Sequence, residues 1–422
     1  MTTKQVKVLY VCPFAHYTGH FPWAAAHETQ ALARAGAEVE LLTFCGAISE
    51  AEVEVPQLTV RSCIKLAIPI YYLATFLRRW GATRWFSMFL EICLTLAVAV
   101  RLKRKLNYDI IHLRDGEPFL FLPHLLSLPF QGYNWAISLT ASNIYPPPIP
   151  SIRPQNLGLL IYTIALKFIN SRLWRPLYRV GLARNRFVFL TQNETSQRDY
   201  SSYLQGVFDG KVIYLPLGTD SVENVISKEK ARQHLGLPQG KPVLLSFGAP
   251  HSGKDLETVL RALKDLPEVY FVHAGRQAFG LGINLEEVAM DYIDADRMSI
   301  RNYYIPESEK PYYFFAADAA IISYARQFLS TTSLLWESCR FGTPAIASDN
   351  GQLKKLMEAF QPGLLFTAQD AASLRQAIIH FINLKPEEIQ AMKDNCRRFS
   401  REFSMERWAQ KCLDIYDGLL IK

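Results

Sequence analysis

A glycine-bearing loop in the second half of the chain ends in a lysine that can bind phosphate. The segment GAPHSGKDLETVL (248–260) follows an apolar run, and a helical pattern begins near Lys254, six residues after Gly248. Backbone N–H groups at a helix start attract anions, and a lysine there adds a full positive charge. The spacing is not that of a Walker A motif, which argues against a nucleotide hydrolase. We predict that Lys254 binds phosphate, the alternative being a solvated lysine at a helix start.

A second segment, FLSTTSLLWESCRFGTPAIAS (328–348), places hydroxyl groups ahead of a helix expected to end at Gly342. Glu337 lies about two turns into that helix, where a carboxylate can accept hydrogen bonds from both vicinal hydroxyls of a ribose. The start of the helix would hold a diphosphate, and ordinary N-capping with an exposed glutamate is the alternative. The hydroxyls and free amides come from four consecutive residues, Ser330, Thr331, Thr332 and Ser333.

Short apolar runs alternate with helical patterns along nearly the whole chain, as in doubly wound α/β proteins. Parallel strands covered by helices on both faces read as such continuous runs. The pattern predicts two Rossmann-like domains, residues 1–218 and 219–402, and a C-terminal helix over 403–422 that packs back on the first domain. The expected strands are residues 6–12, 37–44, 108–113, 135–140, 186–191 and 211–217, then 242–248, 268–275, 299–305, 319–324, 343–348 and 363–366.

Length and composition indicate a folded protein of two domains. The chain has 422 residues, of which 49% are hydrophobic and 20% charged. Its seven cysteines are scattered, without a CxxC pair, which argues against a zinc site or a disulfide framework and fits a reducing compartment. The start, MTTKQVKVLYVC, lacks the features of a signal peptide, so we expect a cytoplasmic protein.

Basic residues interleave with aromatic and aliphatic residues in two stretches of the first half, 64–105 and 157–186. The apolar runs within them, Ile92–Val100 and Leu157–Leu166, fall short of the ~20 residues that span a bilayer. Buried helices would give the same runs. The other interpretation is a peripheral contact with the inner face of the membrane. No recognition-helix or RNA-binding signature accompanies the basic residues, so nucleic acid is not an expected partner.

Residues 205–385 resemble the family 4 glycosyltransferases, which have the two-domain GT-B fold, and the first half resembles them loosely. The resemblance is carried by IYLPLGTD, SFGAPHSGK, YIPESEKPYYFFAADAAIIS and WESCRFGTPAIASDNGQLKKLM. Glu337 falls on the second glutamate of the family's E-x7-E motif, and Lys254 on the lysine six residues after the strand-end glycine. By this resemblance the two domains face each other across a cleft, Lys254 and Glu337 have catalytic roles, and neither cofactor nor metal is required.

Three departures from that family stand out. Leu329 occupies the place of the first motif glutamate, and Ala249 that of the arginine after the strand-end glycine. The histidine after the central strand of the first domain is absent from ISLTASN (137–143). DADR (294–297) has the DxD spelling of metal-dependent glycosyltransferases of the other major fold, and we attribute it to chance.

The loop after the first strand, PFAHYTGHFPWAAAHET (13–29), offers a candidate contact in the first domain. In the family, a glycine-rich turn here approaches the reacting sugar, and Gly19 fits because a residue without Cβ lets the chain come close to a ligand. His20 is a second candidate, as an acid/base or phosphate contact. His112 at the end of run 108–113 is expected to be structural.

The expected function is that of a hexosyl-type glycosyltransferase, with retention at the anomeric carbon. The donor would be a nucleoside diphosphate sugar as co-substrate. The acceptor would be a hydroxyl of a lipid-linked saccharide, a glycolipid or a polysaccharide precursor. Two alternatives stay open, namely a non-catalytic GT-B scaffold or partner subunit and a sugar-nucleotide 2-epimerase.

Overall fold

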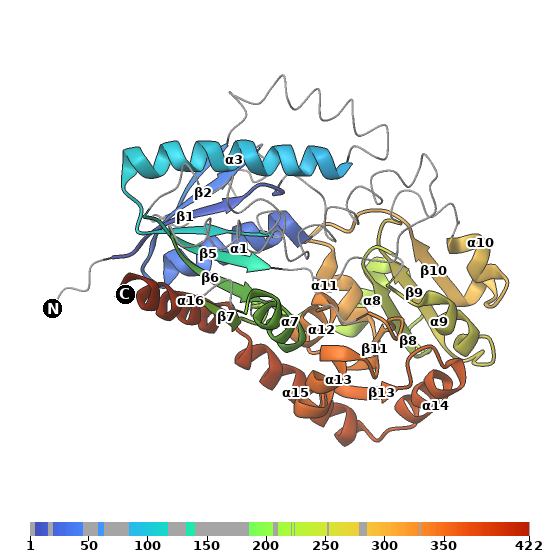
Figure 1. Ribbon diagram of the computed structural model, residues 1–422. Helices are drawn as coiled ribbons and strands as arrows, with labels where there is room; N and C mark the ends of the chain where they lie inside the picture. Colours follow the sequence, from blue (N-terminus) through green and yellow to red (C-terminus); the bar gives the residue numbers. More distant parts are fainter. Residues whose placement is uncertain are drawn as a thin grey trace, which may run out of the picture. The chain divides into compact units, whose positions relative to one another are not determined.

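The computed structural model describes residues 5–15, 20–44, 58–62, 84–116, 132–139, 185–205, 210–220, 222, 224–250, 253–277, 285–328 and 331–421. The chain divides into two compact units (Figure 1). The first comprises Met1–Pro216 together with Met405–Lys422, and the second comprises Leu217–Ser404. Each unit is a parallel α/β sheet, so the predicted pair of Rossmann-like domains is confirmed.

The first unit is built on a seven-stranded sheet in the order β3-β2-β1-β4-β5-β6-β7, in which every pair is parallel. Alternate strand residues enter two different cores. Leu9 and Ile137 belong to one core with helix α3, and Tyr10 and Ala136 to the other with α1 and α16. Figure 1 shows α3 on one side of the sheet and α1 with α16 on the other. The strands are β1 (Lys7–Cys12), β2 (Glu38–Thr43), β3 (Leu58–Ser62), β4 (Ile110–Leu113), β5 (Asn134–Leu139), β6 (Arg186–Thr191) and β7 (Lys211–Tyr214), and the helices α1 (His20–Arg34), α3 (Arg84–Leu106), α7 (Glu194–Leu204) and α16 (Met405–Leu420).

The second unit has a six-stranded sheet in the order β10-β9-β8-β11-β12-β13, also parallel throughout. Its strands also divide their side chains between two cores, with Leu245 and Ile322 in one and Leu244 and Ile321 in the other. Its strands are β8 (Val243–Phe247), β9 (Tyr270–Ala274), β10 (Met298–Arg301), β11 (Ala319–Ile322), β12 (Ala345–Ser348) and β13 (Gly363–Phe366), and its helices α8 (Lys228–Leu235), α9 (Leu256–Leu263), α10 (Leu285–Met290), α11 (Lys310–Ala316), α12 (Ser333–Arg340), α13 (Gly351–Phe360), α14 (Ala371–Ile382) and α15 (Pro386–Glu402).

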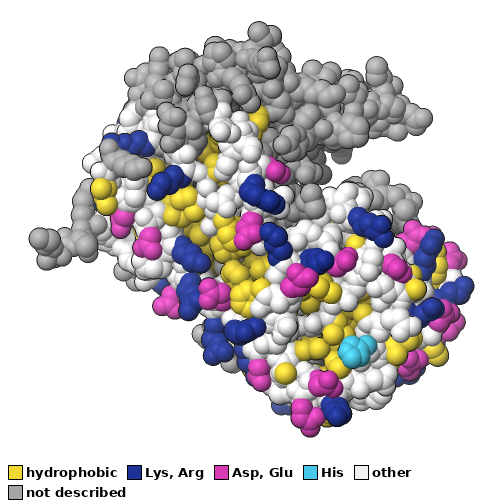
Figure 2. Space-filling view, turned by 60° about the horizontal axis from the view of Figure 1, so that its bottom comes forward, with side chains coloured by type: hydrophobic (Ala, Val, Ile, Leu, Met, Phe, Trp, Pro, Cys, Tyr) yellow, Lys and Arg dark blue, Asp and Glu magenta, His cyan; other side chains and the backbone are white. Residues whose placement is uncertain are grey.

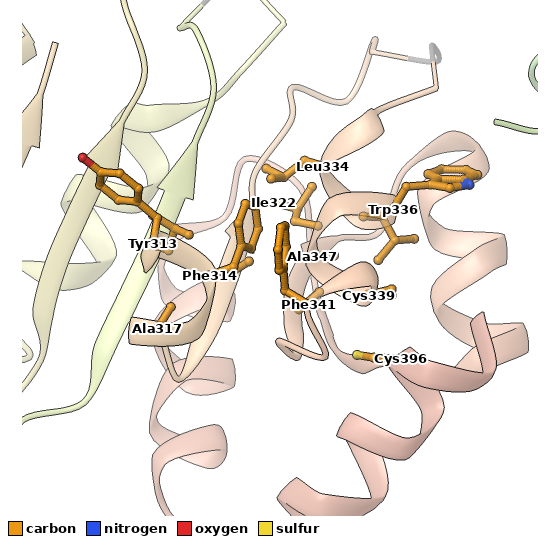
Figure 3. Packing of buried hydrophobic residues seen from close by; sticks show 14 of the residues in the cluster. Tyr313, Phe314, Ala317, Ile322, Leu334, Trp336, Cys339, Phe341, Ala347 and Cys396 are labelled. Carbon is orange, nitrogen blue, oxygen red and sulfur yellow. The ribbon is translucent and has the colours of Figure 1, made fainter. Parts of the chain in front are cut away.

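Helix α12 is anchored by its apolar face. Leu334, Leu335, Trp336 and Cys339 are buried in the first of these cores, to which Phe314 of α11 and Phe399 of α15 also belong. Figure 3 shows Leu334, Trp336 and Cys339 together with Phe314. The indole Nε1 of Trp336 donates to the carbonyl oxygen of Leu217, 2.8 Å away. This burial leaves the opposite face of the helix, with Ser333, Glu337 and Arg340, less buried than its apolar face.

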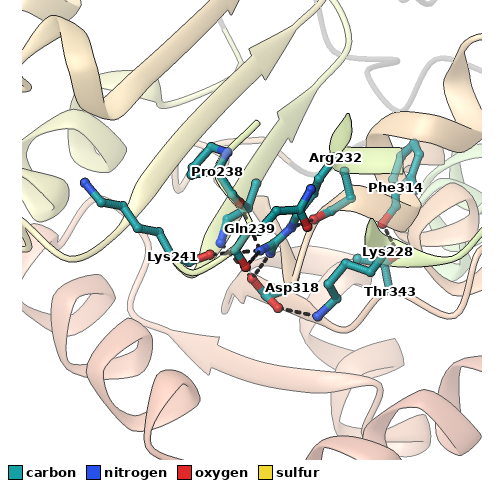
Figure 4. A network of polar contacts seen from close by, with 10 residues as sticks. Lys228, Arg232, Pro238, Gln239, Lys241, Phe314, Asp318 and Thr343 are labelled. Carbon is teal, nitrogen blue, oxygen red and sulfur yellow. Dashed lines mark hydrogen bonds and ion pairs between the residues drawn. The ribbon is translucent and has the colours of Figure 1, made fainter. Parts of the chain in front are cut away.

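A polar network fixes α8 against the start of β11 (Figure 4). The buried guanidinium of Arg232 donates to Asp318 Oδ2 at 2.7 Å and to the carbonyl oxygens of Pro238, Gln239 and Lys241. Lys228 donates to the other Asp318 oxygen at 2.6 Å. Because Asp318 also accepts from the backbone N–H of Val243, it ties α8 to both central strands β8 and β11. The network is structural and lies away from the loops described below.

Two sequence expectations need correction. Strand β3 was not among the expected strands, because LTVRS alternates in polarity instead of forming an apolar run. Helix α15 ends at Glu402 and α16 begins at Met405. Helix α12 ends at Arg340, and Gly342 lies beyond its cap in a left-handed conformation (φ +67°).

Helix α16 confirms the expectation that the C-terminal helix packs on the first domain, because Trp408, Cys412 and Tyr416 are buried in a core of the first unit. In α3, Ile92, Leu96 and Ala99 are buried, which explains the apolar run Ile92–Val100 by core packing. None of the described helices is both long and apolar enough to cross a membrane. Residues 63–83 and 140–184, which hold most of the two basic stretches, lie outside the described residues.

Candidate functional site

Two loops meet where the order of the second sheet reverses. Strands β8 and β11 are neighbours at its centre, and the chain leaves β8 toward β9 but leaves β11 toward β12. Ligands of doubly wound sheets bind at this switch point, beyond the carboxyl ends of the strands. The loops are joined by backbone contacts: Lys254 forms an antiparallel bridge with Tyr324, and the N–H of Asp255 donates to the carbonyl oxygen of Ser323 at 3.1 Å.

Lys254 is turned back onto the end of strand β8. Its Nζ donates to the carbonyl oxygen of Gly248 at 2.9 Å and to that of Phe247. These contacts use two of the three ammonium N–H groups, and the third remains for a ligand. Helix α9 begins at Leu256 with Asp255 as its N-cap, so the prediction that a helix begins near Lys254 is confirmed. The ammonium of Lys254 is positioned by the carbonyl oxygens at the end of β8 and not by the start of α9.

Gly248 is required at this place for two reasons. Its φ of +87° is a left-handed conformation that residues with a Cβ adopt with strain. A Cβ built on Gly248 would lie 3.3 Å from Lys254 Nζ. On its other side the backbone is approached closely by Gly275, where an added Cβ would lie 2.5 Å from the Gly248 carbonyl carbon. Because it lacks a Cβ, Gly248 leaves room for the ammonium of Lys254.

Burial lowers the pKa of Lys254 to about 7, because the ammonium loses hydration that the neutral amine needs less. Burial, followed by the charge of the nearby Lys254, lowers the pKa of His273 to about 3. Neutral His273 lies 3.3 Å from the Ser246 hydroxyl. A phosphate placed beside Lys254 would favour the ammonium and raise its pKa again.

This pKa predicts proton uptake when a diphosphate binds. Above pH 7 most free protein carries a neutral Lys254, so binding at pH 8 should take up close to one proton, and affinity should fall as the pH rises through 7. Calorimetry of UDP binding at pH 8 in two buffers of different ionisation enthalpy measures this uptake. In Lys254→Arg the side chain stays charged at every pH, so the uptake should vanish. Equal proton uptake by the wild type and by Lys254→Arg would show that Lys254 does not contact the phosphates.

The N-terminus of α12 is capped from within the protein. Thr332 is the N-cap, and its Oγ1 accepts from the N–H of Leu334 at 3.2 Å. The Tyr324 hydroxyl lies 2.7 Å from the same oxygen and thereby links the helix start to the Lys254 bridge. The Thr332 hydroxyl is thus engaged, and the amides of the first turn are the groups that this helix can offer to an anion. Thr331 is partly buried, Ser333 is exposed, and Ser330 and Leu329 lie outside the described residues.

The loop before α12 is held by two residues that sequence reasoning missed. Asn350 Nδ2 donates to the carbonyl oxygens of Ala325 and Phe328, at 3.1 and 2.8 Å. The backbone N–H of Tyr324 donates to Ser348 Oγ at 3.1 Å. Ser348 ends β12 and Asn350 follows it, in the segment ASDN, where small polar residues come directly after apolar ones. That cluster of small polar residues is the feature of the sequence from which Ser348 and Asn350 could have been identified.

Glu337 lies on the less buried face of α12, slightly more than one turn from its start. Its side chain is 14% exposed. Lys310 Nζ, at the start of α11, donates to Glu337 Oε1 at 3.0 Å and also pairs with Glu307 at 2.7 Å. Arg340 Nη1 lies 3.6 Å from Glu337 Oε2. The N-capping of the alternative is present in Thr332, but its exposed glutamate is wrong, because the Glu337 carboxylate is ion-paired at a partly buried position.

Lys254, ahead of α9, and Glu337, on α12, lie in the same unit, but their side chains are not in contact. Among the described residues, no hydrogen bond or ion pair joins their side chains. They are connected through Tyr324, Thr332 and the first turn of α12. Two other arginines of this unit could bring charge to a ligand in place of the arginine that Ala249 replaces. Arg326 donates from Nε to the carbonyl oxygen of Ala368 at 3.0 Å, and Arg276 is exposed.

In the first unit, Gly19 lies outside the described residues, and His20 begins α1 with a side chain that is also not described. His112 is wholly buried, with Nδ1 2.5 Å from the Tyr416 hydroxyl and Nε2 2.7 Å from Ser138 Oγ. Burial, followed by the charge of Arg114, lowers the pKa of His112 to about 3. The residue is neutral and ties α16 to the sheet, as its expected structural role requires.

A buried ion pair lies beyond β4 in the first unit. Arg114 Nη2 is 3.1 Å from Glu28 Oε1, and Tyr10 donates to the other Glu28 oxygen. Burial raises the pKa of Glu28. The carboxyl ends of β1 and β4 form the switch point of this sheet, so Arg114 is a charged group that the sequence pattern did not single out there.

The DADR segment is held by internal contacts. Asp294 Oδ2 accepts from Arg297 Nε at 3.3 Å, and residues 295–297 form a short 3₁₀ turn before β10. The described residues contain no group of three or more histidine, cysteine or acidic side chains arranged to hold a metal ion. Acidic and basic side chains are interspersed on the described part of the surface that Figure 2 shows.

Residues 227–399 match the family model of glycosyl transferases, group 1. This range contains Lys254, the start of α12 and Glu337. The match lies in the second unit and covers less than half of the chain.

One curated relative, the alpha-galactosylglucosyldiacylglycerol synthase of Streptococcus pneumoniae, is 22% identical over 227 residues. That alignment covers 50% of this chain and spans about half of the relative, 56% of its length. Similar solved structures include sucrose-phosphate synthase from Thermosynechococcus elongatus, with a TM-score of 0.67, 17% identity and coverage of 99% and 100% of the two chains. HepE of Anabaena, solved with UDP-glucose, has a TM-score of 0.65, 16% identity and coverage of 98% and 100%. At these identities the structures establish the fold.

Proposed function

We propose that this protein is a retaining, hexosyl-type glycosyltransferase of family 4 that uses a nucleoside diphosphate sugar. One observation carries the proposal: Lys254 and the N-terminus of α12 are joined through Tyr324 at the switch point of the second sheet. A cation and free helix amides at this place can stabilise the charge that develops on a diphosphate leaving group. Glu337, further along the same helix, would take the ribose.

Neither a cofactor nor a bound metal is part of the proposal, because Lys254 and the helix amides provide the positive charge. The reaction would pass the sugar to an acceptor hydroxyl. Closure of the site would exclude water, which would otherwise hydrolyse the donor. Gly19 and His20 remain candidate contacts to the reacting sugar from the first unit.

We further propose a glycolipid or lipid-linked acceptor at the inner face of the membrane. The support is the curated relative, whose name describes a synthase of a glycosylated diacylglycerol. The last turn of α3 is compatible with a membrane surface, because Arg104 and Lys105 are exposed beside Leu106, whose exposed fraction is 42%. Such residues attract anionic head groups while an apolar side chain reaches the interface.

Turnover with a panel of sugar nucleotides tests the proposal. UDP-glucose, UDP-galactose and GDP-mannose would each be incubated with the protein and with vesicles containing diacylglycerol or monoglycosyl diacylglycerol. We expect nucleoside diphosphate release that depends on the acceptor, with a glycosylated lipid as product. Binding of a sugar nucleotide without turnover would favour the scaffold. Conversion of the donor without any acceptor, seen by NMR, would favour the 2-epimerase.

A further inference from the structure

The chain passes between the two units at two places, between Pro216 and Leu217 and between Ser404 and Met405. Just inside the second unit, these two connections are paired with each other. The backbone N–H of Thr219 donates to the carbonyl oxygen of Phe403 at 2.8 Å, and Thr219 forms a parallel bridge with Ser404. Phe403 and Ser404 lie between the end of α15 and the start of α16. A chain that bends does so at a few residues of this kind, at the ends of its elements.

Trp336 of α12 contacts both connections. Its indole Nε1 donates to the carbonyl oxygen of Leu217 at 2.8 Å. Its ring packs against that of Phe403, with 5.6 Å between the ring centroids, and edge-on against Phe399 of α15, at 5.2 Å. Figure 3 shows the indole directed away from Phe314. Because Trp336 is only 3% exposed, its ring has little freedom to move independently of α12.

The same helix carries two parts of the proposed nucleotide site. Its first-turn amides would contact the diphosphate, and Glu337, the residue after Trp336, the ribose. A short helix with a tightly packed apolar face moves as one body. Opening of the connection at Leu217 therefore either breaks the hydrogen bond from Trp336 or displaces α12. A ligand bound to α12 opposes that displacement.

We propose that Trp336 is a positioning residue that couples the nucleotide-binding helix α12 to both connections between the units. The inference rests on the proposed function and adds to it a route by which a bound nucleotide restrains the connections. One hydrogen bond, to Leu217, and one ring contact, with Phe403, carry the coupling, and both lie within the second unit.

Hydrogen–deuterium exchange of the Thr219 amide, which donates to Phe403, measures opening of the connections. In the wild type, saturating UDP or GDP should slow this exchange by about fivefold or more, the usual size of such a coupling. Trp336→Phe keeps a ring but lacks the indole N–H. In the free variant the exchange should be about three- to tenfold faster, because one hydrogen bond is lost. Bound nucleotide should then no longer slow it, whereas the affinity in calorimetry should match the wild type, because every proposed ligand contact is kept.

Tyr270→Phe is the matched control. Like Trp336, Tyr270 donates from its side chain to a backbone carbonyl oxygen of the second unit, that of Met298 at 3.1 Å. This variant should exchange the Thr219 amide as the wild type does, with and without nucleotide. A merely structural Trp336 would give faster exchange in Trp336→Phe and an unchanged response to nucleotide. Thermal unfolding of each variant separates these effects from loss of folding.

Two results would overturn the inference. Exchange at Thr219 that does not respond to bound nucleotide in the wild type would do so without any variant, so the test does not depend on Trp336→Phe folding. An equal response in the wild type and in Trp336→Phe would do so as well. A response that needs Trp336, but without sugar transfer, would leave the inference standing and remove the proposed enzymatic function. Failure to bind any nucleoside diphosphate would remove both.

Discussion

Lys254→Met should reduce the turnover number of sugar transfer by about 10²- to 10³-fold, the loss seen when one preorganised charge-stabilising donor is removed from an active site. The ammonium is held by the carbonyl oxygens of Phe247 and Gly248 and keeps one N–H for the ligand. Methionine has a similar length and no charge. The fold should tolerate it, because burial already lowers the pKa of Lys254 to about 7 and so disfavours the charged form in the free protein.

Steady-state kinetics with the best donor measure this effect, and Lys264→Met is the control. Lys264 is exposed and follows α9 in the same unit. The substitution Lys264→Met removes one positive charge without changing the loop that holds Lys254, so the kinetics of this variant should match those of the wild type. Turnover by Lys254→Met at the wild-type rate would reject Lys254 as the phosphate-binding residue.

Glu337→Gln should weaken binding of a nucleoside diphosphate by about 10- to 100-fold, since a hydrogen bond to a charged group contributes about 1.5–3 kcal/mol. The amide keeps the shape of the carboxylate but loses the charge that Lys310 and Arg340 face. Inorganic diphosphate, which has no ribose, should bind to Glu337→Gln as it binds to the wild type. The Lys254→Met variant should lose affinity for both ligands.

Glu358→Gln is the matched control for Glu337→Gln. Glu358 lies on α13, is 56% exposed and pairs with Lys354 on the same helix. An exposed pair of this kind contributes little to stability. If Glu337→Gln binds UDP as tightly as Glu358→Gln does, the carboxylate is a structural partner of Lys310 and not a ribose ligand.

Much of the fold was predictable because buried parallel strands leave a direct mark in the sequence. Each expected apolar run corresponds to an observed strand within a few residues. Strand β3 was missed because LTVRS alternates in polarity, as an edge strand can when it is covered less completely.

The site was predictable only where local spacing determines it. Thr332 was identified by its place before an apolar helix, but the engagement of its hydroxyl by Tyr324 depends on the adjacent loop. Lys310 could not be assigned to Glu337 in advance, because it is 27 residues away in the chain. Arg340 lies three residues after Glu337 on the same helix, a spacing that could have indicated the pair. Residues that meet through tertiary packing leave no periodic signal.

A crystal structure of the protein with UDP tests the central claim most directly. The claim is that one ligand touches both Lys254 and Glu337 at the switch point of the second sheet. We predict phosphate oxygens within hydrogen-bond distance of Lys254 Nζ and of the first-turn amides of α12, with a ribose hydroxyl at Glu337. A complex in which the phosphates lie away from Lys254, or the ribose away from Glu337, would contradict the account.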